Sequence, residues 1–139
     1  MLTFFLSIAI SLMPGLQSEN ANQNLTIQVT GLASSEGQVR IAVYNSAEEF
    51  TKTPFQAKEV KIDGKQTVEV TFSLPEGTYA IAAYHDENEN GKLDTNLVGI
   101  PKENYGFSNN ARGSLGPPSF EDASISVGES AQTTQIELS

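Results

Sequence analysis

The sequence predicts an all-β fold, an antiparallel sandwich of about seven short strands arranged in two sheets. Three observations lead to this prediction. Apolar and polar residues alternate with a period of two in several segments. Turn residues separate these segments, and no stretch with a helical period is longer than about two turns. The chain has 139 residues, which suits one domain, and we assign residues 24–139 to a single β-sandwich.

Six predicted strands have one apolar and one polar face, as expected for a sheet that is buried on one side only. Their inward residues are Leu25, Ile27 and Val29 in 25–32; Val39, Ile41 and Val43 in 38–44; Val60 and Ile62 in 57–62; Val68, Val70, Phe72 and Leu74 in 66–74; Ala123, Ile125 and Val127 in 123–127; and Thr134, Ile136 and Leu138 in 133–138. The segment 78–85 is apolar on both faces, which predicts a central strand.

Glycine, proline and aspartate separate the strands. Turns are predicted at Glu36-Gly37, Pro75-Glu76-Gly77 and Gly128-Glu129. Asp63-Gly64 lies between two alternating segments, which predicts a hairpin.

One short helix is predicted at residues 46–53. Ser46 and Glu49 have the spacing of a capping box, and Pro54 ends the segment. Phe50 is expected to close one end of the core.

Residues 1–18 are predicted to be a secretory signal peptide. Residues 2–13 form an uncharged apolar run, which is shorter than the roughly 20 residues needed to span a bilayer. Pro14-Gly15 ends the run, and Ser18 is a small residue at a suitable cleavage position. No Lys or Arg precedes the run, and a buried strand or helix is the alternative. We expect an exported protein, periplasmic or extracellular, with no stable membrane insertion after cleavage.

The composition argues against several classes of function. The formal charge of −9 makes nucleic acid and anionic membrane surfaces poor partners, because both are recognised by clustered Lys and Arg. The absence of cysteine excludes disulfides, thiolate zinc sites and cysteine nucleophiles. The single histidine excludes a multi-histidine metal site within one chain.

Residues 86–120 interrupt the alternating pattern and are expected to form a long ordered loop. Connections above about 15 residues are uncommon in compact domains. The segment contains apolar residues such as Leu97, Ile100, Tyr105 and Phe107, which a solvated linker would not carry. We therefore expect it to pack over one end of the sandwich.

The start of this segment, residues 86–94, has the ligand spacing of a calcium-binding loop. The predicted ligands are the side-chain oxygens of Asp86, Asn88, Asn90 and Asp94 and the main-chain carbonyl of Lys92. Gly91 is at the position where such a loop turns sharply. Calcium prefers six to eight hard oxygen ligands, and the acidic loop would repel itself without a cation.

The spacing leaves the calcium shell incomplete. Leu97 stands at position 12, where a helix-loop-helix calcium loop has a bidentate glutamate. Glu103 is the nearest acid that could complete the shell, and His85 is a candidate ligand or general base. The alternatives are a hairpin turn at Asn90-Gly91 with solvated acids, and a structural, hydrogen-bonded His85.

Several motifs together resemble a known family. They are His85 to Asp94, Gly99 to Glu103, Tyr105 to Ala111, Pro117 to Phe120 and Pro75 to Ala80. The chain resembles the bacterial exported family catalogued as domain of unknown function 2141. The resemblance implies an immunoglobulin- or transthyretin-like sandwich and export, and it brings no established activity. Residues 86–94 are also similar to calcium loops of sandwich repeats on bacterial surface proteins.

Two functional classes remain. The first is an exported, non-enzymatic module of the bacterial envelope whose calcium loop supports contact with an unknown envelope protein or glycan. The second is a small metal- or carboxylate-dependent enzyme acting on an envelope substrate. We prefer the first, because the chain lacks the convergent His, Cys or Ser sets that catalysis usually needs. Ser108 with His85 is a poor triad candidate, and Tyr105, Phe107 and Phe120 suit core packing better than a ligand platform.

Overall fold

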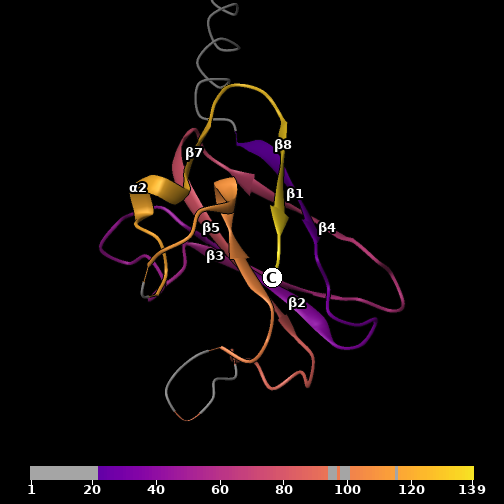
Figure 1. Cartoon of the computed structure of the whole chain (residues 1–139). Helices are drawn as coiled ribbons and strands as arrows, with labels where there is room; N and C mark the ends of the chain where they lie inside the picture. Colours follow the sequence, from indigo (N-terminus) through magenta and orange to yellow (C-terminus); the bar gives the residue numbers. More distant parts are fainter. Residues whose placement is uncertain (1–21, 94–96, 98–100, 115) are drawn as a thin grey trace, which may run out of the picture.

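The computed structural model describes residues 22–93, 97, 101–114 and 116–139, and these form two β-sheets. The elements are β1 (Gln23–Thr30), β2 (Gln38–Tyr44), β3 (Gln56–Lys61), β4 (Val68–Leu74), β5 (Gly77–Asp86), β6 (Tyr105–Phe107), the 3-10 helix η2 (Ser108–Asn110), α2 (Phe120–Ala123), β7 (Ser124–Val127) and β8 (Gln132–Glu137). The smaller sheet has the order β4-β1-β8, and the larger has the order β3-β2-β5-β6 with β7 also paired to β5 (Figure 1). The predicted all-β, two-sheet class is confirmed.

Two details of the strands differ from the prediction. The described residues form eight strands, because β6 lies inside the segment that was expected to be a loop. All pairs are antiparallel except β1 with β8, which is parallel. Alternation does not report strand direction, since inward residues stay inward when a strand is reversed.

The apolar faces of the two sheets pack together and form the main core. Every inward residue predicted for β1, β2 and β4 is buried, with an exposed fraction of at most 9%. Ile62, Ile136 and Leu138 are also buried, whereas Val60 and Ile125 are partly buried against the core. The alternation therefore assigns the inward face correctly, and Val60, Ile125 and Thr134 are the predicted inward residues that stay half-buried.

A second apolar cluster covers the other face of the larger sheet. Tyr44, Phe50, Ala80, Phe107 and Ala123 form its buried part. Side chains of β5 are consequently buried on both faces, which confirms the prediction of a central strand. Figure 1 shows α2 beside this sheet, away from β1 and β4.

The predicted helix at 46–53 is wrong, although its capping contact forms. The segment consists of hydrogen-bonded turns, in which the Glu49 N–H donates to the Ser46 hydroxyl at 3.3 Å. Thr51 has a φ of 65°, so the right-handed path cannot continue past Phe50. Phe50 still closes one side of the molecule as expected, because its ring is buried in the second cluster.

The segment 86–120 is more regular than the predicted loop. It contains β6, η2 and the start of α2. Tyr105 exchanges main-chain hydrogen bonds with Ser139 at 3.1 and 3.3 Å, which ties the segment to the chain end that follows β8. Gly106 is required there, because a Cβ would lie 2.8 Å from the Glu137 carbonyl oxygen. A strand of three residues is too short to give an alternation signal.

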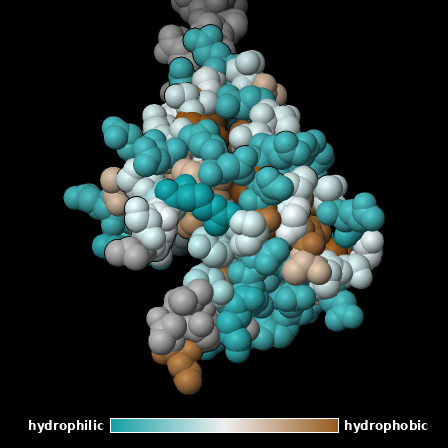
Figure 2. Space-filling model, in the orientation of Figure 1, coloured by the Kyte–Doolittle hydropathy of each residue, from teal (hydrophilic) through white to brown (hydrophobic). Residues whose placement is uncertain are grey.

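The predicted signal peptide, residues 1–18, lies outside the described residues, and β1 begins at Gln23. No helix in the described part of the chain is long and apolar enough to cross a membrane. Figure 2 shows a largely hydrophilic face, with apolar residues visible mainly in gaps between polar ones.

Candidate functional site

Asp86 is the last residue of β5 and the first predicted ligand of the calcium loop. It is completely buried. Its Oδ1 accepts the Asn90 N–H at 3.2 Å, and its Oδ2 accepts the Gly91 N–H at 2.8 Å. The Gln38 amide, from β2, also donates to Oδ2 at 3.1 Å. Asp86 therefore holds the loop against both its own main chain and the neighbouring strand.

The next predicted ligands repeat this pattern of side chain to main chain. The Asn88 Oδ1 accepts the Asn90 N–H at 3.3 Å, and the Asn90 Oδ1 accepts the Lys92 N–H at 3.1 Å. Glu89 and Gly91 both have a positive φ, which makes the loop compact. Such local bonds are typical of Asx-rich turns.

A second acidic residue, Glu103, contacts the loop although it is 16 residues further along the chain than Glu87. Glu103 is 8% exposed, and its Oε2 accepts the Glu87 N–H at 3.0 Å. The buried carboxylate of Glu103 therefore binds the main-chain N–H that directly follows Asp86. This is the acid that the sequence suggested for completing a calcium shell.

An ion pair anchors the outside of the loop. The Lys61 ammonium, from β3, donates to both carboxylate oxygens of Glu89 at 2.8 and 2.9 Å. This hydrogen bond, followed by the charge of Glu89, raises the pKa of Lys61 above its usual value. Both side chains are solvent-exposed, so the pair adds little stability.

The structure brings part of the predicted ligand set together. Asp86, Asn88 and Asn90 direct their side-chain oxygens to main-chain N–H groups of one turn, which includes Lys92, whereas Asp94 lies outside the described residues. Within the described residues, no group of three or more His, Cys, Asp or Glu is placed to hold a metal ion. Amide and carbonyl oxygens also bind calcium. Calcium binding at 86–94 therefore stays a prediction.

His85 is a buried structural residue with both ring nitrogens engaged by the main chain. Its Nδ1 accepts the Ala33 N–H at 3.2 Å, and its Nε2 lies 2.7 Å from the Glu36 carbonyl oxygen. A carbonyl oxygen can only accept, so Nε2 carries the proton. The ring holds the 33–36 turn against β5 and offers no free nitrogen for a metal or a proton transfer.

Ser108 is also a structural residue, because its side chain is hydrogen-bonded to the main chain. Its buried hydroxyl accepts the Ile81 N–H at 2.9 Å and donates to the Ala123 carbonyl. Ile81 lies four residues before His85 on β5, a distance of about 13 Å along a strand. Ser108 and His85 therefore cannot form a catalytic pair.

The aromatic residues proposed as a ligand platform pack mainly into the second cluster. Phe50 makes edge-on contacts with Phe107 and Phe120, with ring centroids 5.9 and 5.8 Å apart. The preference for core packing is thus confirmed for Phe107 and Phe120. Tyr105 is half-buried, and its ring also lies beneath the Arg112 guanidinium at 5.3 Å.

The sequence did not predict an open groove of about 1160 Å³ on the outer face of the larger sheet, here called the outer groove. A row of small side chains forms its floor, because Ala57, Ala42 and Ala82 are direct cross-strand partners on β3, β2 and β5. Arg40 and Tyr84 are partners in the adjacent row. The only sequence signal for this floor was the apolar second face of 78–85.

The walls of the outer groove come from three segments. They are Thr51, Lys52 and Pro54 after β2; Gly91, Lys92 and Leu93 after β5; and Ser114, Gly116 and Pro117 after η2. Burial raises the pKa of the Tyr44 and Tyr84 phenols, which also line the groove. Both hydroxyls therefore remain protonated and able to donate at neutral pH.

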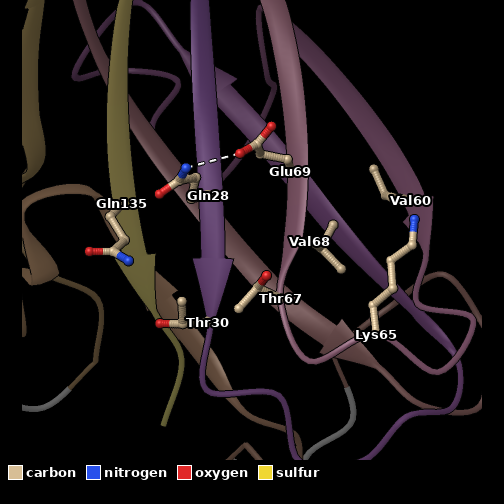
Figure 3. A pocket seen from close by; sticks show the side chains of 8 residues that line it. All are labelled: Gln28, Thr30, Val60, Lys65, Thr67, Val68, Glu69 and Gln135. Carbon is tan, nitrogen blue, oxygen red and sulfur yellow. Dashed lines mark hydrogen bonds between the residues drawn. The ribbon is translucent and has the colours of Figure 1, made fainter.

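A second hollow, of about 330 Å³, is lined by the outer face of the smaller sheet together with Lys65, Val68 and Val60 of β3. Figure 3 shows its polar lining, in which the Gln28 amide donates to the Glu69 carboxylate at 2.9 Å. Glu69, Gln28 and Gln135 form one cross-strand row. This is the solvated face that the alternation predicted.

The chain matches one family model. Residues 27–135 match the family described as an uncharacterized protein conserved in bacteria, DUF2141, which confirms the predicted resemblance. No curated protein matches the chain.

Among solved structures, the chain is similar to the pilus-presented adhesin Spy0125 (Cpa). One structure of that adhesin has 18% identity and a TM-score of 0.33, over 84% of this chain and 26% of the adhesin chain. Another has 20% identity and a TM-score of 0.30, over 85% and 27% of the two chains. The chain thus spans about a quarter of the adhesin's length.

Proposed function

The chain belongs to the family of uncharacterized proteins conserved in bacteria, DUF2141, and from that premise we propose that it is an exported, non-enzymatic module of the bacterial envelope that binds calcium through residues 86–94. Its role is contact with an envelope protein or glycan. The calcium-stiffened loop would hold one end of the contact surface in place.

The observation that carries the calcium proposal is the arrangement around Asp86. A carboxylate has about four acceptor positions, and Asp86 receives three protein donors. The side-chain oxygens of Asn88 and Asn90 each accept a main-chain donor, which places two further hard oxygens in the same loop. Glu103 supplies a second buried carboxylate beside the loop. The donor set consists of hard oxygens, which fit calcium better than zinc or copper.

The engagement of His85 and Ser108 supports a non-enzymatic role. Both side chains use their polar atoms to bond the main chain, as described above. A catalytic histidine needs a ring nitrogen within reach of a substrate proton. The residues that most often carry hydrolysis therefore serve the fold in this chain.

Export is supported by the sequence of residues 1–18, and mass spectrometry tests it. In protein recovered from the envelope of the producing bacterium, we expect the intact mass to lack about 18 N-terminal residues. Protein that keeps Met1 to Ser18 in the mature form would contradict export by this signal. Protein from a cytosolic expression without the signal-processing machinery serves as the uncleaved control.

Thermal unfolding in EDTA and in millimolar calcium tests the loop. Calcium should stabilise the folded protein by RT ln(1 + [Ca]/Kd), about 1.4 kcal/mol at ten times Kd. We expect a Kd of about 10⁻⁴–10⁻³ M, because position 12 is Leu97 and two ligands are neutral. The double variant Asn88→Ala/Asp94→Ala should lose most of this increment.

The matched control is Asn45→Ala/Glu129→Ala, which removes one amide and one carboxylate from exposed positions elsewhere. It should keep the full calcium-dependent shift. A wild-type protein whose melting temperature does not respond to calcium, or an equal response in the loop variant, would show that residues 86–94 form only a polar turn.

A further inference from the structure

The outer groove concentrates the scarce positive charge of an acidic protein. The chain has 8 Lys and Arg against 17 Asp and Glu. Four of the eight cations, Arg40, Lys52, Lys58 and Lys92, line the groove, and no Asp or Glu is among its lining residues in the described part of the chain. Such a distribution attracts an anionic ligand to one face of a molecule that otherwise repels anions.

The four cations are not equivalent. The Lys58 ammonium donates to the Thr71 carbonyl and lies over the Phe72 ring, and Arg40 forms an ion pair with Glu59. Lys52 and Lys92 are exposed and have no ion pair with any residue that the structure describes. These two lysines therefore supply the charge that a ligand would meet.

Lys52 and Lys92 lie at opposite ends of the groove. Lys52 belongs to the turns that follow β2, and Lys92 to the loop that follows the antiparallel strand β5. The floor between them runs from Tyr44 to Arg40, about 13 Å along a strand. A ligand that reaches both lysines must be extended and must carry more than one negative charge.

The lining between the lysines includes tyrosine rings and hydroxyl groups above small and apolar floor residues. Three of the four tyrosines in the chain, Tyr44, Tyr84 and Tyr105, line the groove, together with Thr51 and Ser114. Tyrosine offers an apolar ring and a polar hydroxyl at low entropic cost. Alanines on the floor leave room for rings to lie close to the sheet.

An extended peptide is a weaker candidate for this surface. A peptide usually binds a sheet by adding a strand to an edge. Of the three floor strands, β2 and β5 are paired on both sides and β3 lies at the edge of the sheet, so the main chain of the central floor has no free ladder. Recognition in the outer groove must therefore use side chains, which favours sugar rings with acidic substituents.

We propose that the outer groove binds an acidic oligosaccharide, with Lys52 and Lys92 pairing its carboxylates and the tyrosines contacting its rings and hydroxyls. This inference rests on the proposed role as a contact module and names the class of its ligand. It does not depend on calcium, because none of the lining contacts requires a metal.

Calorimetric titration with tetragalacturonate, in EDTA and low salt, tests the proposal. EDTA removes calcium, which itself associates with carboxylates, and so separates this test from the calcium-loop test. We expect binding to tetragalacturonate, weaker binding to neutral galactotetraose, and a loss of affinity with added salt. The double variant Lys52→Ala/Lys92→Ala should weaken binding by about tenfold or more.

The matched control is Lys65→Ala/Lys102→Ala, which removes the same charge from exposed lysines outside the groove lining. It should change the affinity by less than about twofold. A second variant, Ala57→Trp, places a bulky side chain on the exposed end of the floor and should also reduce binding.

Three results would overturn the proposal. They are no binding of tetragalacturonate to the folded protein, an equal loss in both double lysine variants, and equal binding of a polyglutamate peptide of the same charge. Recovery of uncut tetragalacturonate after incubation would support binding without turnover. Cleavage would contradict the non-enzymatic role and leave the assignment of the groove to acidic sugars supported.

Discussion

Replacing Phe72 by alanine should lower the free energy of unfolding by about 3–5 kcal/mol, the range for large aromatic residues deleted from a core. Phe72 lies on β4 with none of its side chain exposed, and it pairs with Leu25 of β1 across the smaller sheet. Its ring fills the space between the sheets, where neighbouring strands cannot move inward without breaking their register. The cavity would therefore remain open and keep its cost.

Thr71→Ala is the matched control for this prediction. Thr71 is the neighbouring residue on the same strand and is exposed, and its hydroxyl forms a hydrogen bond with the Thr26 hydroxyl at 3.0 Å. Its loss should cost less than about 1 kcal/mol. Urea denaturation of both variants gives the two values. Equal costs would mean that the assigned inward face of β4 is incorrect.

This contrast between neighbours shows what the sequence could predict. The period of two assigns each side chain to a face, and Phe72 and Thr71 follow it. It does not distinguish parallel from antiparallel pairing, so the parallel pairing of β8 with β1 was missed. It also cannot detect β6, whose three residues carry no pattern, or the turns at 46–53, where Thr51 has a positive φ.

The outer groove was missed for a related reason. Its floor depends on Ala57, Ala42 and Ala82 standing opposite one another on three strands. Each alanine alone is an ordinary small residue, and only the register makes them a row. Register is set by turns and by the buried face. The buried face can be predicted from the sequence, whereas the geometry of the turns can be predicted only approximately.

Residues 86–94 show the opposite situation, in which the sequence pattern was clear but is compatible with two structures. Side-chain oxygens at positions 1, 3 and 5 suit calcium ligation. The same positions let Asp86, Asn88 and Asn90 accept main-chain N–H groups within the turn. Spacing alone cannot separate the two arrangements, because a compact loop around an ion also uses such bonds.

Asp86→Ala should be the most damaging change in the loop, with an expected cost of about 3 kcal/mol in unfolding free energy. The variant loses three hydrogen bonds to a buried carboxylate. Asn90 and Gly91 are exposed, and their N–H groups can turn to water. Gln38 is only 8% exposed, so its amide would be left as a buried donor without this acceptor.

Glu87→Ala is the control for Asp86→Ala, because Glu87 is the next carboxylate along the chain and is exposed. Within the described residues its side chain accepts one hydrogen bond, from the Ser34 hydroxyl at 2.9 Å, and its removal should cost less than about 1 kcal/mol. Both variants are compared in EDTA by chemical denaturation. Similar costs for the two would show that Asp86 does not hold the loop to β2. A large cost for Asp86→Ala alone would mean that this variant removes the loop itself, and calcium ligation must then be tested at Asn88 and Asp94, where a ligand can be removed from a folded loop.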